Sequence, residues 1–201
     1  MKAKAAMAGG AVVAAVLVAM SVGAGDLAPP AGPVAGTMKT LEQIEPRTPI
    51  SSLPFNITQS GSYYLTGNLS TTANGITVLA PDVTIDMMGF TITGSTPNDF
   101  AGVLVEFGTT GNFVLRNGMI RRFAQGVTTT DEGETGGGSS VIGVGVEEAG
   151  ITGISLLSGN NLVKDCYAER ATAGAPMALS TGIGVAGGVI ENCRVRGFDY
   201  G

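Results

Sequence analysis

Histidine and tryptophan are absent from this sequence of 201 residues, and charged residues make up only 13% of it. Without histidine, the chain cannot supply a Ser/His/Asp triad, a Cys/His dyad or a His-ligated zinc or haem site. It has 11 basic against 16 acidic residues, a formal net charge of −5, and no basic stripe that would neutralise phosphates. We therefore expect no nucleic-acid partner.

Glycine and hydrophobic residues are abundant in this sequence. The chain contains 32 glycines, and 44% of its residues are hydrophobic, a balance that excludes intrinsic disorder. The length suits one domain with a sizeable core.

The N-terminus has the pattern of an export signal. Lys2 and Lys4 supply positive charge, residues 5–24 are uncharged, and Val22-Gly23-Ala24 fits the small-residue cleavage rule. We predict a signal peptide over residues 1–24 and a secreted or extracytoplasmic protein, with an uncleaved anchor as the alternative. No second apolar run of spanning length follows, so we expect no membrane span after cleavage.

Three further segments are predicted by composition. Residues 25–37, rich in Ala, Gly and Pro, are expected to be a flexible spacer. Residues 38–70 are expected to form an N-terminal cap, beginning with a short amphipathic helix at the capping box Thr40-Leu41-Glu42-Gln43. Residues 71–201 are expected to contain the repeating coils.

Internal repeats decide the predicted fold. The segments VLRNGMIRRF from Val114, VIGVGVEEAG from Val141, LVKDCYAERA from Leu162 and VIENCRVRGF from Val189 align without a gap, and VTIDMMGF from Val83 joins them with one extra residue. Successive segments lie 21 to 31 residues apart. Each is accompanied by a glycine followed by an apolar residue, as in Gly75-Ile76, Gly102-Val103, Gly126-Val127, Gly153-Ile154 and Gly182-Ile183. Val, Ile, Thr and Gly dominate, which favours strands stacked as a solenoid.

The aligned columns alternate as stacked strands should. The second column (Leu115, Ile142, Val163, Ile190) is apolar and expected to face inward, and the third (Arg116, Gly143, Lys164, Glu191) is expected to face outward. The fourth (Asp86, Asn117, Val144, Asp165, Asn192) suits a left-handed bend except at Val144. The eighth (Arg121, Glu148, Glu169, Arg196) is read as a solvated charge ladder. Glu147 falls in an otherwise apolar column. This indicates that the segment from Val141 is aligned one residue out of register with the other repeats.

These stretches, together with Asn74 to Gly94 and Pro54 to Leu69, resemble the right-handed parallel β-helix repeat proteins of the pectin-lyase-like group. The resemblance implies an all-β, right-handed parallel β-helix from about residue 50 onward. It does not imply one activity, because the group contains polysaccharide lyases, glycoside hydrolases and adhesins. Its polygalacturonase-like members use paired Asp residues with Gly-His-Gly, and this chain has neither. No C-terminal cap follows the last repeat, so a partial chain is left open.

Two groups of carboxylates are candidates for chemistry. Asp131, Glu132 and Glu134 lie in the acidic, glycine-rich stretch DEGETGGGSS, where several oxygens could bind calcium; the alternative is a solvated loop. Asp165 and Glu191 could form the carboxylate pair of a glycosidase, or serve only as bend and outward-facing residues. No other cofactor is indicated.

The two cysteines share one column. Cys166 and Cys193 would lie one coil apart, near 4.8 Å, which is within the range for a disulfide. A disulfide and a buried thiol ladder are both left open.

The sequence predicts an extracellular β-helix that binds glycans or attaches to a surface. The alternative is a polysaccharide lyase or glycoside hydrolase acting on an acidic glycan. A polysaccharide or cell-surface glycan is the expected partner, and an exposed last coil predicts self-association.

Overall fold

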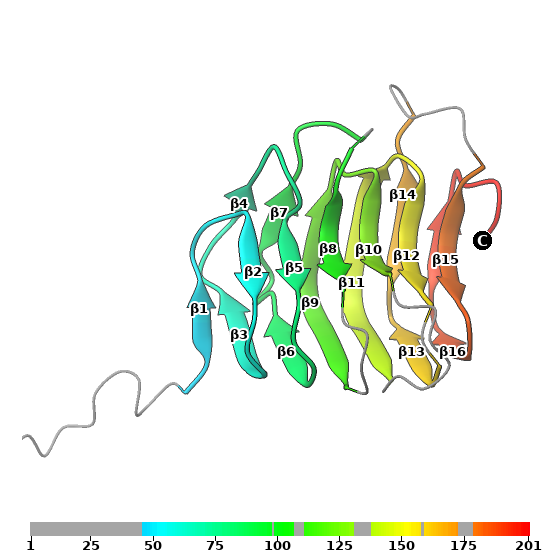
Figure 1. Cartoon of the computed structure of the whole chain (residues 1–201). Coiled ribbons are helices and arrows are strands. Elements are labelled where there is room, and N and C mark those ends of the chain that lie inside the picture. Colours follow the sequence, from blue (N-terminus) through cyan, green and yellow to red (C-terminus); the bar gives the residue numbers. More distant parts are fainter. Residues whose placement is uncertain (1–45, 98, 107–110, 131–137, 158, 173–178) are drawn as a thin grey trace, which may run out of the picture. The chain divides into compact units, whose positions relative to one another are not determined.

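The computed structural model describes residues 46–97, 99–106, 111–130, 138–157, 159–172 and 179–201. The described residues form strands joined by turns, with no helix, and every strand pair is parallel. Successive coils stack side by side along one axis (Figure 1). The predicted all-β parallel solenoid is therefore confirmed. The predicted signal peptide, spacer and short helix lie outside the described residues.

Two sheets form the walls of the coils. The six-stranded sheet contains β2 (Phe55–Ile57), β5 (Ile76–Val78), β8 (Ala101–Val105), β10 (Gln125–Thr129), β12 (Thr152–Leu156) and β15 (Thr181–Val185), stacked in chain order. The eleven-stranded sheet has two halves. Its first half contains β1 (Thr48–Ile50), β3 (Gly61–Leu65), β6 (Val83–Asp86), β13 (Asn161–Lys164) and β16 (Gly188–Glu191). Its second half contains β4 (Leu69–Ser70), β7 (Thr91–Thr93), β14 (Tyr167–Arg170) and β17 (Arg194–Arg196).

Two long strands join the halves of the larger sheet. β9 (Phe113–Arg121) pairs with β6 through its first part and with β7 through its last part. β11 (Ser139–Ala149) pairs with β13 through its first part and with β14 through its last part. Each coil therefore has three walls. Of the segment expected as a cap, residues 48–70 contain strands β1 to β4, at the start of this stack.

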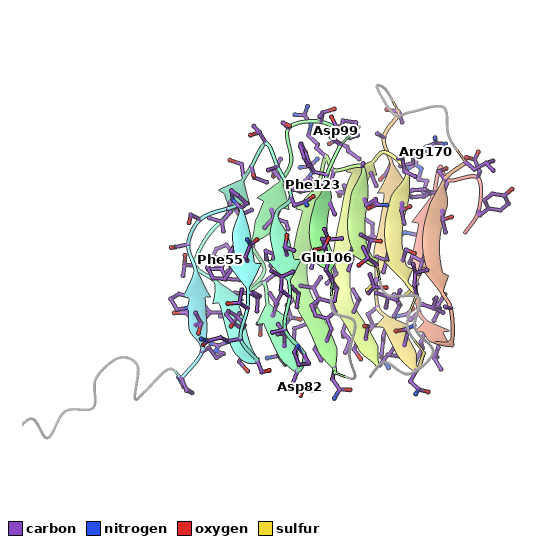
Figure 2. The ribbon with its side chains drawn as sticks, in the orientation of Figure 1. Phe55, Asp82, Asp99, Glu106, Phe123 and Arg170 are labelled. Atoms are coloured by element: carbon purple, nitrogen blue, oxygen red, sulfur yellow. The ribbon has the colours of Figure 1, made fainter. Side chains whose placement is uncertain are left out.

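The core is a set of apolar ladders inside the coils. In the smaller sheet, Ile76, Val103, Val127 and Ile154 pair in register and are fully buried. Ile85, Leu115, Val141 and Val163 form the matching ladder of the larger sheet. Phe123, also buried, fills the interior where the coils turn (Figure 2). Each such side chain contributes about 1.5–3 kcal/mol by burial, so the ladders hold the coils together.

The bend between the halves depends on left-handed backbone. Asn117, Gly143, Asp165 and Asn192 occupy equivalent positions on four coils and have φ values of 58°, 61°, 54° and 53°. Asn, Asp and Gly adopt this conformation at lower cost than other residues. The predicted column of bend residues is thus correct at Asn117, Asp165 and Asn192. It is wrong at Asp86, which pairs with Arg116 one position before the bend, and the left-handed residue of that coil is Met88, with a φ of 54°.

The alignment around residue 141 was wrong by one residue. Val114 pairs with Ser140, whereas the repeat alignment placed it beside Val141. Gly143 therefore occupies the bend, Val144 lies buried beside Gly118, and Ile142 takes the outward position between Arg116 and Lys164. The same shift places Glu147 beside Arg121, which confirms the predicted slip.

Candidate functional site

The predicted carboxylate pair is divided between two structural positions. Lys164 lies 3.1 Å from Glu191 in an outward column, and this ion pair raises the pKa of the lysine. The carboxylate of Asp165 accepts a hydrogen bond from the Asn192 side chain at the bend. Each carboxylate thus has a neighbour other than its proposed catalytic partner. A catalytic role for Asp165 and Glu191 stays a prediction.

The predicted calcium ligands cannot be placed. Asp131, Glu132 and Glu134 lie outside the described residues. Within the described ranges, no group of three or more His, Cys, Asp or Glu side chains is arranged to hold a metal ion.

The two cysteines lie one above the other on neighbouring coils, as predicted from their column. Both are free thiols, Cys166 buried and Cys193 half-buried. Burial raises the pKa of the Cys166 thiol to about 11. At neutral pH this thiol is therefore protonated.

A groove crosses the outer face of the second half of the larger sheet, over β11, β14 and β17. It has a volume of about 440 Å³ and is lined by Glu147, Tyr167, Ala168, Glu169, Arg194 and Arg196. Two outward columns supply its polar walls, because side chains two positions apart on a strand face the same side. Tyr167 pairs with Arg194 in the first column, and Glu169 pairs with Arg196 in the second.

Tyr167 forms the floor of this groove because Gly145 leaves room for its ring. A Cβ atom on Gly145 would lie 2.5 Å from Cε1 of Tyr167 and 2.8 Å from Sδ of Met119. The ring therefore lies along the sheet, and its hydroxyl donates a hydrogen bond to Glu147. Burial, together with the neighbouring Glu147 carboxylate, raises the pKa of Tyr167 to about 12. At neutral pH Tyr167 is thus a neutral hydrogen-bond donor.

Charges of both signs surround the ring. Glu147 lies 2.9 Å from Nε of Arg121, and the same guanidinium lies 2.9 Å from Glu148. Arg196 approaches Glu169 at 3.8 Å while its own side chain is 81% exposed. These groups give the groove hydrogen-bond acceptors and donors at fixed positions.

Arg194 differs from Arg196, the other arginine that lines the groove. Its guanidinium lies 6.0 Å from the centroid of the Tyr167 ring, and it forms no ion pair with any residue in the described part of the chain. The side chain is exposed. Arg194 is therefore a cation free to bind an anionic ligand next to an aromatic ring.

Sequence reasoning found only part of this groove. The charge column of Arg121, Glu169 and Arg196 was identified, but Glu148 was placed in it instead of Glu147. The role of Tyr167 was missed. The sequence feature that could have revealed this role is Gly145. In the correct register it lies between Met119 and Tyr167, and its lack of a side chain leaves room for the tyrosine ring.

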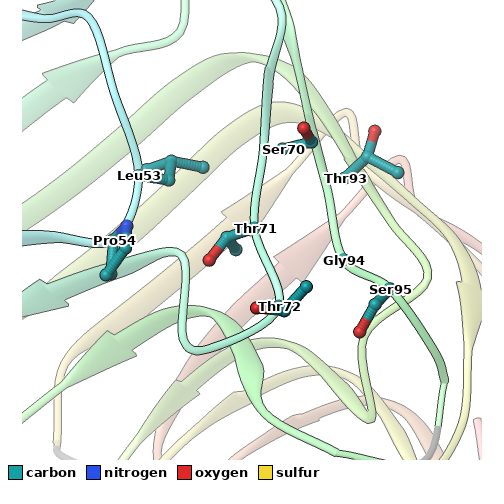
Figure 3. Close-up of a pocket in the computed structure, with 8 residues that line it drawn as sticks. All are labelled: Leu53, Pro54, Ser70, Thr71, Thr72, Thr93, Gly94 and Ser95. Carbon is teal, nitrogen blue, oxygen red and sulfur yellow. The ribbon is translucent and has the colours of Figure 1, made fainter.

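A second hollow lies near the N-terminal end of the stack (Figure 3). It has a volume of about 490 Å³ and is lined by Leu53, Pro54, Ser70, Thr71, Thr72, Thr93, Gly94 and Ser95. The Thr71 hydroxyl already accepts a hydrogen bond from the Ala73 amide. The lining has hydroxyl groups but no charge and no aromatic ring, so it offers a ligand less than the groove does.

The described strands and turns include no helix with the length and hydropathy needed to cross a membrane. Comparison with protein-family models, curated proteins and solved structures finds no match to this chain.

Proposed function

We propose that this protein is an extracellular β-helix repeat protein that binds an acidic glycan in the groove over β11, β14 and β17. The observation that carries the proposal is the exposed Arg194 guanidinium beside the Tyr167 ring, without an ion-pair partner among the described residues. The export signal and the resemblance to the pectin-lyase-like group, both drawn from the sequence, support the extracellular assignment.

The groove offers the contacts that an acidic sugar uses. The Tyr167 ring presents an apolar surface to the C–H faces of a sugar ring. Arg194 and Arg196 can bind a uronate carboxylate through two parallel N–H···O bonds, which fix its orientation. Glu147 and Glu169 can accept hydrogen bonds from sugar hydroxyls. One patch thereby recognises both the acid group and the ring.

The overall charge works against binding at a distance. The formal net charge is −5, so long-range electrostatics repel an acidic polymer and only the local arginines attract it. Binding should depend on close contact, and should weaken as salt screens the arginines.

Isothermal titration calorimetry with an oligogalacturonate tests the proposal, and a neutral oligosaccharide of equal length serves as the ligand control. Arg194→Gln should weaken binding by at least about tenfold, the usual value of a charged hydrogen bond. Lys164→Gln, an exposed cation on the other half of the same sheet, is the matched control and should leave affinity unchanged. Equal affinity for the neutral ligand, or equal loss in both variants, would refute the proposal.

Enzymatic cleavage of an acidic glycan is the second candidate. Its support is that Glu147 and Glu169, from neighbouring coils, line one groove, and glycosidases use two carboxylates that face one cleft. The assay is release of reducing or unsaturated ends from acidic polysaccharides, with calcium and with chelator. Release that is lost in Glu169→Gln would favour the enzyme, and binding without release would favour the binding protein.

A further inference from the structure

The stacking of Cys166 and Cys193 is set by the strands on both sides of them. Lys164 pairs with Glu191 before the cysteines, and Tyr167 pairs with Arg194 after them. The cysteines are therefore directly opposite each other on adjacent coils. Adjacent parallel strands lie about 4.8 Å apart, and disulfides join Cα atoms about 4.4–6.8 Å apart. The usual spacing of adjacent strands therefore falls within the Cα range of a disulfide.

The thiols make equivalent contacts. Sγ of Cys166 lies 3.1 Å from the Lys164 carbonyl and 3.4 Å from the Val141 carbonyl of the preceding coil. Sγ of Cys193 lies 3.2 Å from the Glu191 carbonyl and 3.5 Å from the Val163 carbonyl. Cys193 thus already reaches back to the coil that holds Cys166. A bond between the two sulfurs would replace the contact of Cys166 with the Val141 carbonyl or that of Cys193 with the Val163 carbonyl.

An oxidant can reach the two cysteines from the surface of the protein. A hollow of about 370 Å³ is lined by Asp165, Cys166, Tyr167, Asn192, Cys193 and Arg194. Cys193 is the more exposed of the two thiols, so it is the one that an oxidant meets first.

We propose that Cys166 and Cys193 are joined by a disulfide that links the coil of β16 and β17 to the coil of β13 and β14. The oxidant is a small-molecule or oxidoreductase disulfide. The Cys193 thiolate attacks it, forming a mixed disulfide and releasing one thiol. Cys166 then loses its proton and attacks the Cys193 sulfur, releasing the second thiol. The two protein thiols lose two protons and two electrons, and the oxidant disulfide takes both up.

The bond would have a consequence for the groove. Tyr167 follows Cys166 and Arg194 follows Cys193, so the disulfide would fix the two coils that carry the ring and its neighbouring cation. The disulfide itself does not rest on the proposed glycan binding.

Peptide mapping tests the disulfide on the full chain after incubation with glutathione disulfide. Trypsin cleaves after Lys164, Arg170 and Arg194, so each cysteine falls in its own peptide, 165–170 and 171–194. The expected result is that these peptides migrate as one linked species without reductant and separate with it, and that no disulfide joins two chains. Cys193→Ser and Cys166→Ala should each abolish the linked species. Separate glutathione adducts on the two peptides, or linkage only between two chains, would overturn the proposal.

Hydrogen exchange gives a second readout that does not depend on either variant folding. Oxidation of the wild-type chain should slow exchange of the β16 amides by about tenfold or more, because the cross-link restricts local opening. Exchange in β5, far along the stack, is the internal control and should not change. Equal exchange in β16 before and after oxidation would show that no bond joins these coils.

Discussion

Gly126 and Gly153 lie on neighbouring coils so close together that a Cβ atom on Gly126 would be 2.4 Å from the carbonyl oxygen of Gly153. The same relation joins Gly75 to Gly102 at 2.3 Å and Gly153 to Gly182 at 2.3 Å. At positions 75, 126 and 153 the recurring glycine is thus required by the approach of one coil to the next.

Gly126→Ala should therefore destabilise the fold. The new methyl group meets backbone on one side and Cγ1 of Val146, at 2.5 Å, on the other, so neither neighbour can move freely. We expect a loss of about 3 kcal/mol in the free energy of unfolding, measured by chemical denaturation. Gly67→Ala is the matched control, because a Cβ atom there meets nothing within 4 Å. Equal stability of the two variants would contradict the stacking described here.

Asp86→Asn should also destabilise the fold, and the effect should depend on pH. Asp86 is buried, which would raise the pKa of its carboxyl group. Hydrogen bonds from the Met88 amide and the Asn117 side chain, and the Arg116 guanidinium at 3.0 Å, outweigh this and lower that pKa. Removing the charge should cost about 2 kcal/mol at neutral pH.

The sign of this pH dependence follows from the lowered pKa. The Asp86 carboxylate stabilises the fold above its ordinary pKa of 3.8, and the contribution is lost as the pH falls through the lower value of the folded state. Wild type and Asp86→Asn should therefore converge in stability in acid. A difference between them that stays constant down to the lowest pH would show that the charge is not responsible.

Tyr167→Phe should change stability in alkali. The pKa of Tyr167 is raised from 10.0 to about 12, so the folded chain holds this proton where the unfolded chain releases it. The contribution of the hydroxyl is present below pH 10 and is lost as the pH rises toward 12. Urea denaturation over this range should show a steeper decline for wild type than for Tyr167→Phe. Parallel declines would argue against the half-buried hydroxyl and its hydrogen bond to Glu147.

The two thiols should react at different rates. Cys166 is buried and its pKa is raised to about 11, whereas Cys193 is half-buried. Iodoacetamide reacts with thiolates, so reduced protein near neutral pH should be alkylated first at Cys193, as followed by mass spectrometry of the two tryptic peptides. Denatured protein should show equal rates. Faster alkylation of Cys166 in the folded chain would contradict the burial.

The fold was predictable because its signals are repeated. Inward apolar residues recur along the stack, glycines recur at close approaches between coils, and four coils have an Asn, Asp or Gly at the bend, so one misread unit among several did not change the result. The misread unit began at Val141, where consecutive valines and glycines satisfy two registers almost equally. In the sequence only Glu147, in an otherwise apolar column, pointed to the correct register, which the pairing of Ser140 with Val114 shows.

The groove was harder to predict because it depends on that register and on a missing side chain. Shifting β11 by one residue exchanges Glu147 and Glu148 in the charge column, and only the correct register places Gly145 beside Tyr167. Asp165 and Glu191, chosen as carboxylates in adjacent columns, lie at a bend and in an exposed ion pair. Residue type gave candidates, but the position of each in the coil was needed to choose among them.

Nuclear magnetic resonance titration of the isotopically labelled chain with an oligogalacturonate tests the central claim most directly, because it reports where the ligand binds. The account predicts saturable shifts concentrated at Glu147, Tyr167, Glu169, Arg194 and Arg196, the residues of the groove. Shifts at Ser70, Thr71 and Thr93 in the hydroxyl-lined hollow instead, or no saturable shift at all, would contradict it.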